Sequence, residues 1–182
     1  MIYLLLADGF EEIEALTPLD VLRRAGIEIK TVGINGKYAK GSHGIVVECD
    51  ITAEDADMSE LDMVILPGGM PGSTNLDASP FTDKAIKAVL DNGGRLAAIC
   101  AAPLVLGRRG LLVGRSATCY PGFESELAGA TVVDKSVVTD GNITTAKGMG
   151  VALAFAKELV SLLVGKEAAD KISTAICEDI NV

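Results

Sequence analysis

The sequence predicts a single three-layer α/β domain with a mainly parallel sheet, and three observations lead to this fold class. Short, continuously apolar runs alternate with segments whose apolar residues recur at helical spacing. Strands that are apolar on both faces are typical of a parallel sheet covered by helices on both sides. The chain is 182 residues long, 49% of them hydrophobic, and shows no linker, low-complexity segment or internal repeat. We therefore expect one domain over residues 1–182.

The first half of the chain shows this alternation. The run IYLLLA at 2–7 is expected to form a buried strand. The next segment, 11–26, is expected to form a helix that ends at Gly26 and that Pro18 either kinks or restarts. A second strand is expected at 27–34, and the stretch NGKYAKGSHG then predicts a turn-rich connection into GIVVEC.

The second half continues the pattern. LDMVILPGG at 61–69 predicts a strand that runs into a glycine turn, and a helix is expected at 81–94. RLAAIC at 95–100 predicts a strand, followed by a helix at 101–110. Short strands and a hairpin come next, and one long terminal helix is expected over 148–172.

Composition restricts the partners and the compartment of the protein. The formal net charge of −9 repels phosphate backbones and anionic lipids, so we expect neither nucleic-acid nor membrane partners. The apolar start lacks a basic flank and ends at Asp8, unlike a signal peptide, which favours a cytoplasmic protein. None of the four cysteines forms a CxxC pair, and the chain has one histidine, His43. The spacing therefore predicts free thiols and no metal site.

Sites on such a sheet form at the carboxyl ends of the strands. Three predicted loops lie there, Ala7–Glu11, Pro67–Gly72 and Cys100–Pro103. Cys100 follows a strand and precedes a helix, which is the arrangement of a nucleophile elbow. The positive end of the helix would lower the pKa of its thiol, and the free N–H of Ala101 could stabilise an oxyanion. The alternative is a small, buried core thiol.

The first predicted helix offers acids as partners for this thiol, because His43 is interpreted as a surface residue in a polar turn. Glu11 and Glu14 share a face of the helix, whereas Glu12 is expected to point elsewhere. Glu14 lies at the inner edge. Burial beside a thiol would raise the pKa of its carboxyl, so the two groups could share one proton. The LPGG turn (Leu66–Gly69) would add exposed amides, although an ordinary turn explains it equally well.

Four stretches together resemble the ThiJ/PfpI superfamily, in the branch of the Parkinson's-disease protein and bacterial YajL. They are ADGFEEIEALTPLDVLRRAG, DMVILPGGMPGSTNL, AAICAAP and TTAKGMG. The resemblance implies a flavodoxin-like sandwich that forms a homodimer, with Cys100 as the easily oxidised cysteine and Glu14 as a protonated glutamate hydrogen-bonded to it. It also implies an oxyanion and substrate site, whose residues here are Gly68, Gly69, Ala101 and Tyr120. Tyr120 stands where the Parkinson's-disease protein has a histidine.

The resemblance implies a cofactor-independent enzyme that acts on reactive α-oxo aldehydes, converting methylglyoxal to lactate, or on glycated protein side chains. Cys100 as nucleophile, Glu14 as acid and base, and nearby amides are enough for this chemistry. A redox-sensing stress protein or chaperone that uses the same cysteine is the alternative. An intracellular amidase or peptidase is disfavoured, because Ala101 stands where the peptidase branch has a histidine.

Overall fold

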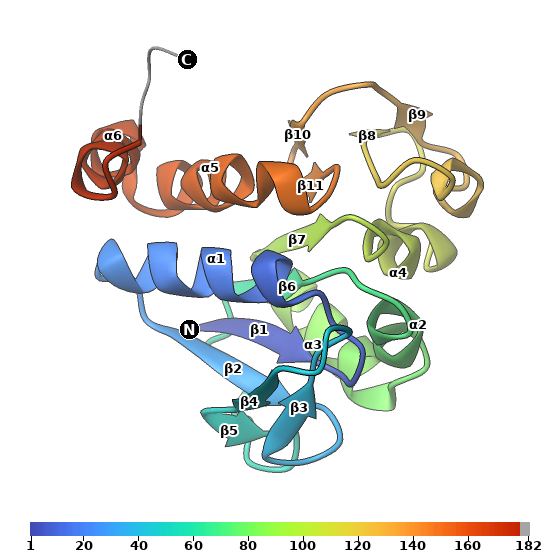
Figure 1. The fold of residues 1–182 in the computed structure, drawn as a ribbon. Coiled ribbons are helices and arrows are strands. Elements are labelled where there is room, and N and C mark those ends of the chain that lie inside the picture. The colour runs from blue at the N-terminus through green and yellow to red at the C-terminus, as the bar shows by residue number, and fades with distance from the viewer. Residues whose placement is uncertain (179–182) are drawn as a thin grey trace.

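The computed structural model describes residues 1–178, which form three layers (Figure 1). The strands are β1 (Ile2–Leu6), β2 (Ile29–Gly33), β3 (Tyr38–Lys40), β4 (Val46–Glu48), β5 (Ile51–Thr52), β6 (Met63–Leu66), β7 (Arg95–Ile99), β8 (Ser116–Ala117), β9 (Thr131–Val132), β10 (Val137–Asp140) and β11 (Ile143–Ala146). The α-helices are α1 (Glu12–Arg24), α2 (Gly72–Asp77), α3 (Pro80–Asp91), α4 (Pro103–Arg108), α5 (Ala152–Val164) and α6 (Lys166–Ala175), with 3₁₀ turns at Glu124–Glu126 and Met149–Val151.

The central layer is a seven-stranded sheet over the described residues, in the order β10-β11-β7-β6-β1-β2-β5. All neighbouring strands are parallel except β10, which runs antiparallel to β11. β6 therefore lies between β1 and β7, and the carboxyl ends of these three strands are adjacent. The mainly parallel sheet confirms the predicted fold class.

Helices cover both faces of the sheet, with α1, α5 and α6 on one face and α2, α3 and α4 on the other (Figure 1). Strand β1 contributes to both cores, because successive side chains of a strand point to opposite faces. Leu4 and Leu6 belong to the same core as Phe155 of α5, whereas Leu5 belongs to the same core as Leu104 of α4. Burial on both faces is what made the strand sequences continuously apolar.

The prediction of one long terminal helix is wrong. Gly165 has φ 98° and ψ 159°, far from helical values, and it separates α5 from α6. The connection predicted after β2 also contains more structure than expected, because β3 and β4 pair there as an antiparallel hairpin. Helix α1 continues through Pro18. Among residues 1–178, no helix has both the length and the hydropathy that crossing a membrane requires.

Candidate active site

The structure brings the three predicted loops together at the carboxyl ends of β1, β6 and β7. The loop after β1 lies on the loop after β6, since the Glu11 N–H donates to the Gly68 carbonyl at 2.9 Å and the Gly72 N–H donates to the Gly9 carbonyl at 3.1 Å. The loop after β7 adjoins them at Cys100. Backbone hydrogen bonds thus hold a single cluster of loops in place.

Cys100 occupies the elbow between β7 and α4. Its φ of 66° lies in the left-handed region, and within residues 1–178 only Cys177 shares this feature among non-glycine residues. Both of its backbone groups are fixed: its N–H donates to the Ala146 carbonyl at 2.9 Å, and its carbonyl accepts from the Tyr120 N–H at 2.8 Å. The thiol is partly exposed. Cys100 also packs against both hydrophobic cores, so its burial alone does not separate a reactive thiol from a core thiol.

Glu14 projects from α1 against this thiol. Its side chain is 1% exposed, and its Oε2 accepts a hydrogen bond from the Gly68 N–H at 3.0 Å. Gly68 also borders the Cys100 side chain, so the carboxyl and the thiol are neighbours. Burial raises the pKa of Glu14 to about 7, and the charge of Glu11 adds to this effect against the opposing hydrogen bonds. The expected raised pKa and the expected contact with Cys100 are both present.

The pKa of the Cys100 thiol is raised, whereas its position at a helix end predicted a lowered pKa. Burial and the negative charge of Glu14 raise the pKa of Cys100 to about 12, although the backbone N–H groups of Gly69 and Ala101 act to lower it. Two negative charges therefore do not coexist in this pair. A thiolate at Cys100 requires the remaining proton to reside on Glu14.

Glycine at position 68 makes the approach of these groups possible. A Cβ atom there would lie 2.4 Å from Glu14 Oε2 and 2.6 Å from Cys100 Cβ. At Gly69, whose φ is 89°, a Cβ would lie 2.3 Å from the Glu11 nitrogen. The LPGG turn is thus shaped by close packing against both neighbouring loops, which an ordinary turn does not require.

Tyr120 lies at the rim of the same cluster and is half exposed. Besides the bond from its N–H to Cys100, its ring packs beside Gly148, where an added Cβ would lie 3.2 Å from Tyr120 Cδ2 and 3.7 Å from Glu14 Oε1. All six residues predicted for the site therefore gather in one place. The functional role of each remains a prediction.

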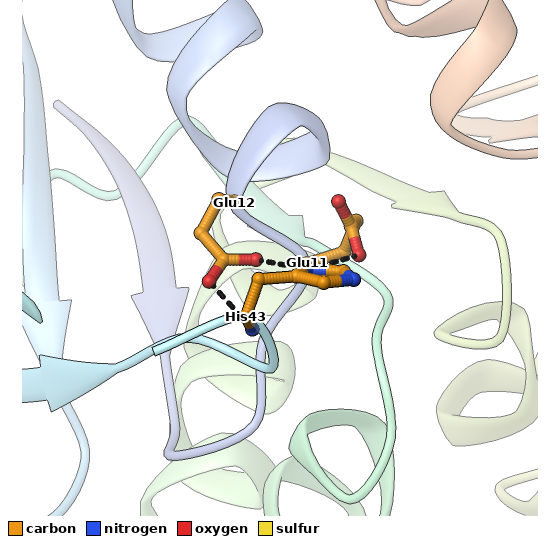
Figure 2. Close-up of side chains that lie close together, drawn as sticks. All are labelled: Glu11, Glu12 and His43. Carbon is orange, nitrogen blue, oxygen red and sulfur yellow. Dashed lines mark hydrogen bonds and ion pairs between the residues drawn. The ribbon is translucent and has the colours of Figure 1, made fainter. Parts of the chain in front are cut away.

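His43 lies with the other two acids of the first helical turn (Figure 2). Its Nδ1 is 2.9 Å from Glu12 Oε2 and 3.4 Å from Glu11 Oε2. Glu12 is 4% exposed, and its carboxylate is bound by His43. Burial acts to raise the pKa of Glu12, but hydrogen bonds from the side chain and backbone of His43 lower it to about 2. No spacing rule links these residues, because they are 31 positions apart.

Comparison with known proteins agrees with this architecture. The model of the DJ-1/PfpI family matches residues 1–162. Protein dj-1beta of Drosophila melanogaster is 38% identical over 175 residues, covering 94% of each chain. Its crystal structure superposes with a TM-score of 0.92 at 36% identity, covering 97% of this chain and 96% of that chain.

Two further relatives carry the names of enzymes. A glutathione-independent glyoxalase of Caenorhabditis elegans is 31% identical and covers 96% of this chain and 94% of its own. A deglycase of Pyrococcus abyssi is 33% identical and covers 89% of this chain and 98% of its own. With the elbow cysteine, the buried glutamate and a family match over most of the sequence, the chain belongs to the DJ-1/PfpI family.

Proposed function

We propose that this protein is a cofactor-independent, glyoxalase- or deglycase-like enzyme that acts on reactive α-oxo aldehydes through Cys100 and Glu14. The observation that carries the proposal is that the Cys100 side chain and the buried Glu14 carboxyl, whose pKa is raised, meet beside Gly68. The names of the Caenorhabditis and Pyrococcus relatives support the same class of reaction.

Covalent attack is the first step for methylglyoxal. With the shared proton on Glu14, the Cys100 thiolate adds to the aldehyde carbon and forms a carbon–sulfur bond. The aldehyde oxygen gains negative charge beside the N–H groups of Gly69 and Ala101, and Glu14 then gives it the proton. The product of this step is a neutral hemithioacetal next to the Glu14 carboxylate.

Proton transfer between the two carbons follows. The Glu14 carboxylate removes the hydrogen of the former aldehyde carbon and returns a proton to the former ketone carbon. The hydroxyl proton of the hemithioacetal passes to the former ketone oxygen, and the product is a lactoyl thioester. The first carbon is oxidised and the second is reduced, so the step is redox-neutral and needs no external oxidant. Water then hydrolyses the thioester, releasing lactate and restoring Cys100.

Two other functions use the same cysteine or class of site. Oxidation sensing selects exposed thiolates. Burial and Glu14 oppose the thiolate of Cys100, and they oppose it equally in the proposed mechanism. A cysteine peptidase needs a base such as histidine at its thiol. The one histidine of the chain, His43, is bound to Glu12 instead.

Lactate formation from methylglyoxal by purified protein tests the proposal. Cys100→Ser is expected to abolish turnover, and Glu14→Gln to do so almost completely while keeping the shape of the side chain. Cys177→Ser is the matched control, because it alters an exposed thiol in the turn that follows α6 and should leave the rate unchanged. Unchanged turnover in Cys100→Ser would reject the mechanism.

The thiol pKa provides a second readout that does not depend on the choice of substrate. In the Cys177→Ser background, the pH dependence of iodoacetamide labelling at Cys100, followed by intact mass, gives this pKa. Glu14→Gln should lower it, because the negative charge that opposes the thiolate is gone. An unchanged pKa would show that the two groups are not coupled.

A further inference from the structure

A second cluster of chemically capable side chains lies at the start of α1, and the proposed mechanism does not use it. Glu11 and Glu12 meet His43, which the connection between β3 and β4 carries toward the helix (Figure 2). Ser42 joins them through its hydroxyl. One imidazole nitrogen, two carboxylate oxygens and a hydroxyl therefore face a common point.

Five of the six distances among these four atoms are equal to or slightly below the separation of ligands in a tetrahedral coordination shell. Ser42 Oγ lies 3.1 Å from His43 Nδ1, 3.3 Å from Glu11 Oε2 and 3.4 Å from Glu12 Oε2. His43 Nδ1 lies 2.9 Å from Glu12 Oε2 and 3.4 Å from Glu11 Oε2. Ligands about 2.0–2.1 Å from a tetrahedral zinc ion are separated from one another by about 3.3–3.4 Å. Small shifts of side chains would therefore suffice to receive such an ion.

The Glu12 carboxylate is held in position for this role. Its Oε1 accepts backbone N–H groups from His43 at 2.8 Å and from Ile45 at 3.4 Å. Gly41 packs so closely that a Cβ there would lie 2.2 Å from the same oxygen. Oε2 is thereby left to face His43 and Ser42. A ligand oxygen fixed in this way loses little conformational freedom when an ion binds.

Access and ligand chemistry select the kind of ion. The His43 side chain is 70% exposed, so the cluster is open to solvent on that side. Two carboxylates and an imidazole, which an ion would bind in place of its proton, give the charge and the mixed nitrogen–oxygen set that suit a divalent transition metal. Magnesium and calcium prefer oxygen ligands alone and are disfavoured.

The geometry points to a binding site for a divalent transition-metal ion, exemplified by Zn²⁺, formed by Glu11, Glu12 and His43 with Ser42 or water as the fourth ligand. The chain has one histidine, and it lies in this cluster. The site is distinct from the Cys100–Glu14 pair. Its existence does not depend on the proposed enzymatic activity.

Calorimetric titration of chelator-treated protein with Zn²⁺ tests the site. The Cys177→Ser background removes an exposed thiol that could compete for the metal. One ion per chain is expected to bind. His43→Gln, which keeps a hydrogen-bonding group but removes the imidazole, should weaken binding about tenfold or more, as should Glu11→Gln. Glu54→Gln, an exposed acid elsewhere, is the matched control and should bind as the parent does.

Proton NMR tests the site directly in the wild-type protein. The chain has a single histidine, so its imidazole signals are assigned without a variant. Zn²⁺ should shift the His43 resonances and saturate at one equivalent. Co²⁺ should give the absorption of a nitrogen–oxygen site without a sulfur-to-metal charge-transfer band. Unshifted His43 resonances at millimolar Zn²⁺, or equal affinity in His43→Gln, would show that the cluster is only a hydrogen-bonded ion pair.

Discussion

The carboxyl of Glu14 shows how one buried residue couples the chemistry of the site to its stability. Removal from water favours its protonated form, and protonation in turn permits a negative charge on Cys100. The same group must contribute to the pH dependence of folding, because its proton affinity differs between the folded and the unfolded chain.

We expect Glu14 to destabilise the protein as pH rises. Its pKa is about 7 when folded, against an ordinary value of 4.5. Its contribution to stability is thus fully present below pH 4.5 and is lost as pH rises through 7. At about 1.4 kcal/mol per pKa unit, the loss is roughly 3 kcal/mol. Urea denaturation of metal-free protein, repeated from pH 4.5 to above pH 7, measures this effect. Over that range the free energy of unfolding of wild type should fall by this amount relative to that of Glu14→Gln. Parallel curves for the two proteins would contradict this.

Gly68→Ala should disable the site and weaken the fold. The new Cβ would overlap Glu14 Oε2 and Cys100 Cβ, so one of the two groups must move. We expect loss of most methylglyoxal turnover and destabilisation by about 1–3 kcal/mol, which is the usual cost of overpacking. Thermal melting and lactate assays measure both effects. Gly150→Ala is the control, because its Cβ would meet no heavy atom within 4 Å.

Single residues were predictable where a local rule applied. Cys100 was identified because a strand, small residues and Pro103 surround it, and Glu14 because it lies on the inner edge of a helix. The direction of the thiol pKa was not predictable, since it depends on burial and on a carboxylate 86 positions away. The pairing of Glu12 with His43 was not predictable for the same reason, because the two residues come from different elements.

At the scale of elements, the terminal segment shows the limit of periodicity. Apolar residues keep their helical spacing across Gly165, so the sequence predicts one helix. The structure has two, α5 and α6. A single glycine can end a helix by adopting a conformation that other residues avoid. The β3–β4 hairpin was missed because its strands are three residues each, shorter than a pattern can define.

Gly165→Ala is expected to destabilise the protein by about 1 kcal/mol or more, because its φ of 98° is unfavourable for a residue with a Cβ. No atom lies within 4 Å of the position that the Cβ would take, so backbone strain is the only cost. Urea denaturation, with Gly150→Ala again as control, measures it. A variant as stable as wild type would mean that this end of α5 is free to rearrange.

For the whole molecule, the parallel sheet was the most predictable feature, because both-sided burial leaves a clear signal in every central strand. Association between copies is different, since it depends on surfaces that sequence patterns do not define.

Three large apolar residues are exposed near the start of α1 and in β4 and the turn before it. Their exposed fractions are 46% for Ile13, 53% for Ile45 and 57% for Val46. Ile13 and Ile45 line one surface groove with apolar residues of α1 and α5. A contiguous apolar patch of this kind is typical of an interface.

We therefore expect the homodimer implied by the family resemblance to form through this face. Ile13→Lys combined with Ile45→Lys should convert a dimer to a monomer, because two charges would be buried without partners. Light scattering after size-exclusion chromatography measures the mass. Val113→Lys is the matched control, as Val113 is 64% exposed outside this groove and its change should leave the dimer intact. A monomeric wild type would exclude the interface.

The backbone conformation of Cys100 has a cost in stability that only a function of its side chain explains. Its left-handed φ is easiest for glycine and next easiest for asparagine. A chain shaped only by its ability to fold would carry one of these there. A cysteine at that position instead lowers the stability of the fold by about 1–3 kcal/mol. Packing elsewhere in the sheet must offset this loss.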